Sequence, residues 1–360
     1  MEWKEDVLGS VLEVKYGKDH KKLADGQYPV YGSGGLMRYV DSKLYDGPSI
    51  LIPRKGTLNN IMFVESPFWT VDTMFWSIIN TDKVDPKFLF YSICKRDFAS
   101  MNVGSAVPSM TVNILNDIQI SYPKNIEDQR RIASILSSLD RKIELNNKIN
   151  ADLEEMAQAI FKNWFVDFEP FKDGKFVDSE LGMIPEGWKV GRLGELCNFK
   201  RGKNLLTKNA IDEGVPVVAG GLEPSCYHNV ANTGAPVITV SGSGANAGFM
   251  RMYHVPVWAS DCSFIDISCE NFYFVYCFLK VNSKLLKHAQ TGAVQPHVKP
   301  SDIHDFELVI PDKESIYEFQ DKVKPFFDKI AAIQKENSRL SLLRDTLLPR
   351  LMSGELEIPE

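Results

Sequence analysis

The sequence predicts an α/β (α+β) protein in which two similar β-rich domains are separated by two long antiparallel coiled-coil helices, with pseudo-two-fold symmetry. Three observations predict this fold: the second half repeats landmarks of the first, short β-type runs fill each half, and a heptad stripe of apolar residues follows each half. The predicted order is a domain over residues 1–123, a spacer helix over 124–169, a linker over 170–185, a second domain over 186–311 and a second spacer helix over 312–354.

The repeat covers most of the chain. Landmarks recur in the same order at an offset of 185 to 191 residues, which is improbable without duplication of one domain. We interpret the repeated Trp69, Asp72, Trp258 and Asp261 as structural residues. The matched positions are Trp3 with Trp188, Leu8-Gly9 with Leu193-Gly194, Pro29-Val30 with Pro216-Val217, Trp69 with Trp258, Asp72 with Asp261, Phe75 with Phe264, and Pro108 with Pro296.

Within each domain, short strands and one helix are predicted. Pro48–Pro53 and Ala235–Val240 are rich in β-branched residues and bounded by turn residues, a pattern typical of strands. Lys87–Lys95 and Phe272–Lys280 are aromatic and continuous, which favours buried helices, although periodicity alone leaves strands open.

The period changes after each domain. Apolar residues then follow at alternating spacings of four and three, and some 35 helical residues at about 1.5 Å each would span roughly 50 Å. An asparagine interrupts each stripe, and a buried asparagine fixes the register of a helix pair. The alternative is that each helix merely packs on its own domain. The first stripe is Ile132, Leu136, Leu139, Ile143, Asn146, Asn150, Leu153, Ala157, Ile160 and Trp164; the second is Val323, Phe326, Ile330, Ile333, Asn337, Leu340, Leu347 and Leu351.

Composition and charge narrow the functional classes. The net charge of −6 argues against a nucleic-acid partner at first, but the excess acid lies in 124–185 and 312–360, and the two domains are nearly neutral. The longest apolar run, Phe272–Leu279, is too short to span a bilayer, and no secretory signal opens the chain, so we expect a cytoplasmic protein. The six cysteines lack metal-ligand spacing and are expected to be reduced thiols.

Four segments carry a resemblance to a known family. They are Glu-Asp-Gln-Arg-Arg-Ile-Ala at 127–133, Ala-Ile-Phe-Lys-Asn-Trp-Phe-Val-Asp-Phe-Glu-Pro at 159–170, Ile-Pro-Glu-Gly-Trp at 184–188 and Leu-Leu-Pro-Arg-Leu-Met-Ser-Gly-Glu at 347–355. The chain resembles the specificity subunits of type I restriction-modification systems, and its domains resemble the recognition domain of Taq-type adenine methyltransferases. Gln320 keeps the glutamine of the helix entry, while Tyr317-Glu318-Phe319 and Asp321 depart from the pattern.

The resemblance implies a non-catalytic subunit that binds double-stranded DNA. Each of two target-recognition domains would read one half of an asymmetric bipartite site, and the helices would dock two methyltransferase subunits. Motor endonuclease subunits would join for cleavage. No cofactor or metal is expected in this chain; S-adenosylmethionine, ATP and Mg²⁺ would belong to the partner subunits. Neither an adenine-pocket motif nor a Walker phosphate loop occurs in the sequence.

Polar and basic loop residues are the candidates for DNA contact, because Arg, Lys, Asn, Gln and Ser read base edges and phosphates. The candidates in the first domain are Ser33, Arg54, Lys55, Asn59, Asn60 and Ser109. The candidates in the second domain are Lys200, Arg201, Lys203, Asn204, Ser241, Ser243, Asn246, Gln295, His297 and Lys299.

Three further interpretations stay open. The glycine pattern at 242–247 could be a dinucleotide-binding turn, but a strand is expected after it where that fingerprint needs a helix. The chain could also be a coiled-coil adaptor that binds no DNA. The aromatic cluster Phe161, Trp164, Phe165 and Phe168 is either a partner-docking surface or a packed junction with the second domain, and we favour the junction.

Overall fold

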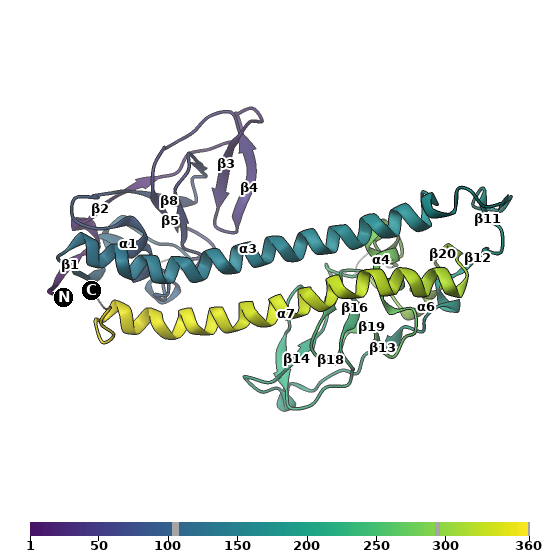
Figure 1. The fold of residues 1–360 in the computed structure, drawn as a ribbon. Helices are drawn as coiled ribbons and strands as arrows, with labels where there is room; N and C mark the ends of the chain where they lie inside the picture. Colours follow the sequence, from purple (N-terminus) through teal and green to yellow (C-terminus); the bar gives the residue numbers. More distant parts are fainter. Residues whose placement is uncertain (103–107, 292–295, 359–360) are drawn as a thin grey trace. The chain divides into compact units, whose positions relative to one another are not determined.

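The computed structural model describes residues 1–102, 108–291 and 296–358. The chain forms two compact units, one of residues 1–145 with 336–360 and the other of residues 146–335. Two 40-residue helices, α3 (Ile126–Phe165) and α7 (Lys313–Met352), each contribute one part to each unit (Figure 1).

The first unit contains a four-stranded sheet in the order β2-β8-β5-β6, a three-stranded sheet β4-β3-β7 and the pair β1-β9. Its elements are β1 (Trp3–Val7), η1 (Leu8–Ser10), β2 (Leu12–Tyr16), β3 (Tyr28–Gly32), β4 (Gly35–Val40), β5 (Ser49–Pro53), β6 (Met62–Val64), β7 (Trp69–Thr70), β8 (Met74–Ile79), α1 (Pro86–Ile93), η2 (Ala99–Met101), α2 (Val112–Asn116) and β9 (Gln119–Pro123).

The second unit contains sheets in the orders β13-β19-β16-β17 and β15-β14-β18, and the pairs β12-β20 and β10-β11. Its elements are η3 (Glu169–Phe171), β10 (Phe176–Val177), β11 (Ile184–Pro185), β12 (Lys189–Arg192), η4 (Leu193–Glu195), β13 (Lys200–Arg201), η5 (Thr207–Asn209), β14 (Val215–Val218), β15 (Cys226–His228), β16 (Val237–Ser241), β17 (Met250–Tyr253), β18 (Trp258–Ala259), β19 (Cys262–Asp266), α4 (Phe272–Val281), α5 (Ser283–His288), α6 (Pro300–His304) and β20 (Glu307–Ile310).

The internal repeat is confirmed by topology. Each unit has the same strand order in its four-stranded sheet, and each three-stranded sheet includes one parallel pair, β3 with β7 and β14 with β18. The tryptophan landmarks have equivalent roles, since Trp69 Nε1 donates to the Lys18 carbonyl at 2.9 Å and Trp258 Nε1 donates to the Lys203 carbonyl at 2.8 Å. The two units are therefore diverged copies of one domain.

Two matches made on the sequence, Phe75 with Phe264 and Asp72 with Asp261, are corrected by the strand register. Phe75 lies opposite Ile52, whereas Val240, the equivalent of Ile52, lies opposite Ser263. Phe264 is therefore the equivalent of Trp76 and not of Phe75. The first unit has one residue more between the tryptophan and the strand than the second. Thr73, whose carbonyl accepts from Arg54 N, is therefore the equivalent of Asp261, whose carbonyl accepts from Gly242 N, and Asp72 is not.

The predicted strands and short helices are confirmed. All five residues of β5 and of β16 are buried, as expected for central strands that pair on both sides. The predicted helix over Lys87–Lys95 corresponds to α1, whose N-terminus is capped by the Asp85 carboxylate accepting from Phe88 N at 3.0 Å. The predicted helix over Phe272–Lys280 corresponds to α4.

The heptad stripes are confirmed as the inner faces of α3 and α7, because every predicted stripe residue is buried or half-buried. In the first unit the helices run antiparallel, with Arg344 Nη1 at 2.7 Å from Asp140 Oδ1 and Lys142 Nζ at 3.6 Å from Glu336 Oε1. Burial opposes the charge of Arg344, but hydrogen bonds to Asp140 and Asp345 outweigh it and raise the pKa of Arg344. The helices also pack on their own domains, so both interpretations of the stripe hold.

Two glutamines join the long helices to the short ones. Buried Gln129 on α3 accepts from Asp85 N at 2.7 Å and donates to the Pro123 carbonyl at 2.7 Å. Gln320 on α7 accepts from Tyr273 N at 3.0 Å and donates to the Glu270 carbonyl at 2.9 Å. The repeated glutamine therefore fixes the start of α1 and of α4 against the following long helix, although its neighbours differ.

The aromatic cluster is confirmed as a packed junction. Phe161 and Phe165 are buried, and the Phe165 ring centroid lies 5.0 Å from that of Phe274 and 5.2 Å from that of Phe319. Trp188 closes the cluster, with its ring centroid 4.8 Å from that of Phe171. The division into domains, linker and spacer helices at the predicted residues stays a prediction.

Candidate nucleic-acid interface

In the first unit, the loop after β5 pairs with the segment after residue 107. Lys55 forms a β-bridge with Ser109, Met110 N donates to the Arg54 carbonyl at 2.9 Å, and Gly56 N donates to the Pro108 carbonyl at 3.2 Å. Three candidates, Arg54, Lys55 and Ser109, are thereby brought together by backbone hydrogen bonds.

The turn between β3 and β4 joins this loop. Asn60 Nδ2 donates to the Ser33 carbonyl at 2.8 Å, and a Cβ at Gly56, where φ is +89°, would lie 3.0 Å from Ser33 Oγ. Glycine at position 56 therefore permits both the left-handed backbone and the close approach of Ser33. Ser33 and Asn60 belong to the same cluster as Arg54 and Lys55.

Asn59 has a different role. Its amide donates to Asp97 Oδ1 at 3.2 Å and accepts from Ala99 N at 2.8 Å, so the side chain fastens this loop to the segment that follows α1. Both polar ends of the amide are therefore occupied within the domain.

In the second unit, the loop after β16 makes the same backbone contacts. Ser243 forms a β-bridge with His297, Val298 N donates to the Gly242 carbonyl at 3.1 Å, and Gly244 N donates to the Pro296 carbonyl at 3.1 Å. Ser243 and His297 therefore occupy the positions of Lys55 and Ser109. The loop framework is shared, while the side chains on it differ.

A polar network lies beside this loop. The Asp261 carboxylate forms an ion pair with Arg201 and accepts a hydrogen bond from Ser243 Oγ. The strand β17 follows the glycine turn, and the Arg201 guanidinium lies where a Cβ at Gly242 would be. The dinucleotide interpretation is therefore wrong, because no helix follows the turn and Asp261 is engaged by protein groups.

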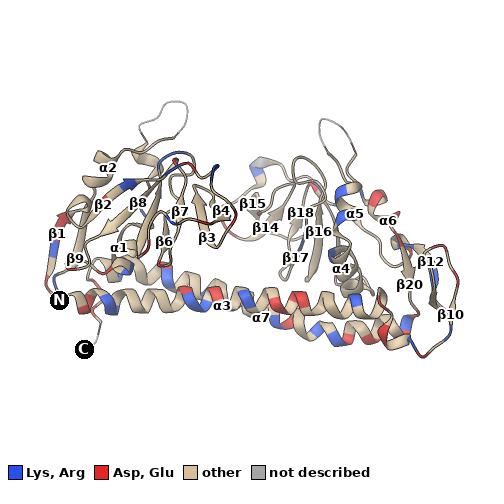
Figure 2. Ribbon diagram, turned by 90° about the horizontal axis from the view of Figure 1, so that it is seen from above, with Lys and Arg blue, Asp and Glu red and all other residues tan. Residues whose placement is uncertain are grey.

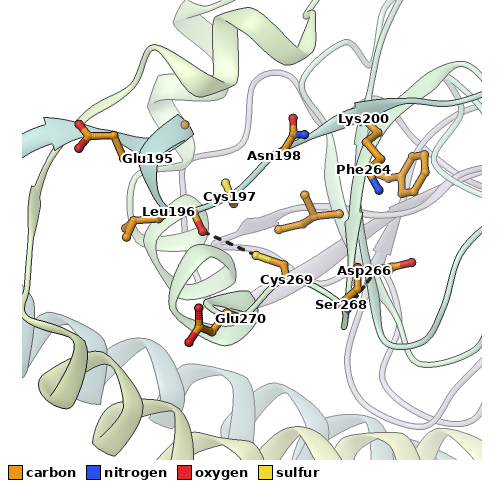
Figure 3. Close-up of a pocket in the computed structure, with 12 residues that line it drawn as sticks. Glu195, Leu196, Cys197, Asn198, Lys200, Phe264, Asp266, Ser268, Cys269 and Glu270 are labelled. Atoms are coloured by element: carbon orange, nitrogen blue, oxygen red, sulfur yellow. Dashed lines mark hydrogen bonds between the residues drawn. The ribbon is translucent and has the colours of Figure 1, made fainter.

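Lys200 and Arg201 are neighbours on β13, so their side chains leave opposite faces of the sheet. Lys200 lines a cavity of about 440 Å³ with the acidic residues Glu195, Asp266 and Glu270 (Figure 3). Burial would raise the pKa of Asp266, but hydrogen bonds from Ser268 and from Gly234 N, with the charge of Lys200, lower it. Three carboxylates make this cavity unsuitable for a phosphate.

The remaining candidates differ in accessibility. Lys203, Asn204 and Lys299 are exposed, and Asn246 is half-buried. Ser241 is only 3% exposed and its hydroxyl donates to the Gly220 carbonyl, so its prediction as a DNA contact is corrected: the side chain belongs to the core. Gln295 lies outside the described residues.

Two residues that sequence reasoning missed lie at the end of β2 or just beyond it. Tyr16, at the end of β2, is 55% exposed and lies under the Arg54 guanidinium, with Cζ at 5.5 Å from the ring centroid. Lys18 is exposed and is the equivalent of Lys203, since both accept the tryptophan hydrogen bond described above. The repeat could have identified Lys18 as a candidate, because the candidate Lys203 lies 185 residues after it, within the offset of the repeat.

The part of the chain that the structure describes shows no candidate metal site, and its cysteines are unreactive in character where burial raises their pKa. No group of three His, Cys, Asp or Glu residues that could hold a metal ion occurs there. All six cysteines are free, and burial raises the pKa of the Cys94 thiol to about 11, which leaves it protonated near neutral pH. None of the described helices has both the length and the apolar character of a membrane span.

The long helices and the loops differ in charge. Acidic and basic residues alternate along α3 and α7 (Figure 2), so these helices offer no continuous basic strip to a phosphate backbone. The basic side chains Arg54, Lys55, Arg201 and Lys203 lie instead in the clusters at the strand ends. The loops are thus the better candidates for a polyanion.

Comparison with known proteins agrees with this architecture. The family model for the type I restriction modification DNA specificity domain matches residues 1–155 and 185–341, and each range contains one copy of the repeated domain. The type I restriction enzyme MjaIX specificity subunit of Methanocaldococcus jannaschii is 30% identical over 94% of this chain and 86% of its own length. The HindI specificity subunit of Haemophilus influenzae is 26% identical over 82% of this chain and 83% of its own length.

A solved structure shares the fold. The crystal structure of the type I restriction-modification system S subunit from M. genitalium matches with a TM-score of 0.62 at 18% identity, over 99% of this chain and 97% of that one. The family model and the full-length relatives together decide the assignment: the chain belongs to the type I restriction-modification specificity subunits.

Proposed function

We propose that this chain is a non-catalytic subunit that reads an asymmetric bipartite DNA sequence, one half with each unit. The observation that supports this proposal most directly is that two copies of one loop framework present different side chains. Lys55 and Ser109 in the first unit correspond to Ser243 and His297 in the second. Identical frameworks would position each loop in the same way on a duplex, and different side chains would select different bases.

The long helices would hold the recognition units apart and dock the partner subunits. Their inner faces are occupied within the units, yet large apolar side chains remain on their outer faces, which is typical of surfaces that other proteins cover. In this proposal two methyltransferase subunits bind there, supply S-adenosylmethionine chemistry on adenine, and are joined by ATP- and Mg²⁺-dependent motor endonuclease subunits. The exposed apolar residues are Leu145, Met156, Tyr317, Leu342 and Leu343.

The test is salt-dependent duplex binding by the assembled complex, measured by fluorescence anisotropy. With about five basic side chains neutralising phosphates, we expect the association constant to fall roughly 100- to 1,000-fold between about 50 and 200 mM salt. Replacing the exposed Lys203 by alanine should lower the salt slope by about one, without changing the preferred sequence.

A second candidate function is a coiled-coil adaptor without DNA binding, which the exposed apolar residues on α3 and α7 would also suit. An adaptor would bind the partner subunits but leave labelled duplex free at every salt concentration. That outcome would contradict the proposed function.

A further inference from the structure

At one end of the four-stranded sheet in the first unit, called the edge below, β2 and β5 stop and the antiparallel β8 begins. Tyr16 at the end of β2 and Ile52 near the end of β5 both lie opposite Phe75 on β8. Two residues beyond Ile52, Arg54 N donates to the Thr73 carbonyl at 2.8 Å. Positions 16 and 54 are therefore close together at this edge.

The equivalent edge of the second unit has the same register. Arg201 on β13 and Val240 on β16 both lie opposite Ser263 on β19. Two residues beyond Val240, Gly242 N donates to the Asp261 carbonyl at 3.1 Å. Hence Arg201 is the equivalent of Tyr16, and Gly242 is the equivalent of Arg54.

Each unit thus has one arginine at this edge, supplied from a different strand. In the first unit the guanidinium of Arg54 lies over the Tyr16 ring, and Nη1 donates to the Asp72 carbonyl at 3.1 Å. In the second unit the guanidinium of Arg201 lies over Gly242, where a Cβ would be 2.1 Å from Nη1. Any side chain at position 242 would displace the guanidinium from this place.

A different neighbour lies against each guanidinium. The Tyr16 ring does so for Arg54, and the ion-paired Asp261, which Ser243 Oγ also contacts, does so for Arg201. Both groups keep further N–H donors free of the contacts named here, and the Arg201 side chain is 45% exposed. A guanidinium held in one orientation can donate two hydrogen bonds to two acceptors that lie in one plane. A phosphate needs no such arrangement, because the mobile ammonium group of a lysine binds it equally well.

We propose that Arg54 and Arg201 are specificity-determining residues, each reading the O6 and N7 acceptors of a guanine in its own half of the target. This inference rests on the proposed function and deepens it. Asp261 and Tyr16 are positioning residues in this account. The same recognition geometry has been kept in both copies of the repeat while the strand that supplies the arginine has been exchanged.

The test uses the complete set of subunits in a host without adenine methylation, with methylated adenines mapped across the genome. Arg201→Lys is expected to lower discrimination for guanine at one position of one half of the motif by about 10- to 100-fold, leaving the other half unchanged. Arg54→Lys is expected to do the same in the opposite half. Asp261→Asn should weaken the same position as Arg201→Lys, because it removes the group that orients the guanidinium.

Matched controls are available in each unit. Arg251 is paired with Glu223 at 2.9 Å and stacks on Tyr253, and Arg38 is paired with Asp25 at 3.1 Å. Arg251→Lys and Arg38→Lys should leave the motif unchanged. A uniform loss of methylation with an intact motif in Arg54→Lys and Arg201→Lys would overturn the inference, because phosphate contacts or folding defects act on all sequences alike.

A second experiment asks whether the guanine preference can be restored after Arg54 is removed. Arg54→Gly should lose the guanine preference in its half, and adding Tyr16→Arg with Thr73→Asp should restore it by building the second unit's arrangement in the first. Failure of the triple variant, when it folds and assembles, would contradict the exchange. The unsubstituted complex distinguishes failure of the proposed function from failure of this inference. Methylation without any sequence motif would contradict the proposed function. A motif that lacks guanine in either half would contradict only the inference about Arg54 and Arg201.

Discussion

Replacement of Phe319 by alanine is expected to lower the free energy of unfolding by about 3 to 5 kcal/mol. Phe319 is fully buried, and its ring centroid lies 5.2 Å from that of Phe165 and 5.7 Å from that of Phe161. Both α3 and α7 supply residues to this cluster, so a cavity here removes contacts between the helices as well as within the domain. Guanidinium denaturation followed by the fluorescence of Trp164 and Trp188, which lie in the same cluster, measures the loss.

Tyr317 is the matched control. It lies two residues away on α7 and is 71% exposed, so Tyr317→Ala should change the free energy of unfolding by no more than about 0.5 kcal/mol. Equal effects of Tyr317→Ala and Phe319→Ala would show that the cluster around Phe319 does not hold the second unit together.

Insertion of seven helical residues into both α3 and α7 is expected to lengthen the gap between the two halves of the target by up to about three base pairs. Seven residues add roughly 10.5 Å of helix, and base pairs stack about 3.4 Å apart. Placing the insertions after Leu145 and after Lys335, where the two units meet in the sequence, keeps each unit's own contacts. Mapping of methylated adenines reports the gap directly.

The same insertion in α3 alone is the control. It shifts one helix against the other and should destabilise the protein, because ion pairs such as that between Asp140 and Arg344 fix their register. An unchanged gap in the double insertion would refute the spacing role of the helices.

The repeat and the long helices could be predicted from the sequence because both depend on periodicity. Stripe residues such as Ile132 and Ile330 recur at spacings that only an amphipathic helix buries on one face, and they are buried. The register of β8 and β19 could not be predicted, since one additional residue before β8 moves Phe75 out of line with Phe264 while leaving both apolar.

The candidate site was predictable by residue type but not by geometry. Arg, Lys and Ser at strand ends indicated loops that the structure does bring together, such as those of Lys55 and Ser109, yet Ser241 is buried and the Asn59 amide is bonded within the domain. The first unit has tyrosine and arginine at positions 16 and 54, whereas the second has arginine and glycine at the equivalent positions 201 and 242. A comparison of one position at a time does not reveal that the arginine has moved from one strand to another. The strand pairing reveals it, because the pairing shows which positions of the two units are equivalent.

The central claim is that each copy of the repeat reads its own half of a DNA target, and exchanging one copy tests it most directly. Residues 186–311 would be replaced by the corresponding domain of a relative with a different target, and methylated adenines would be mapped in cells that carry the complete system. The account predicts that one half of the motif changes completely while the other half keeps its sequence. A chimera in which both halves change, or in which neither does, would contradict it.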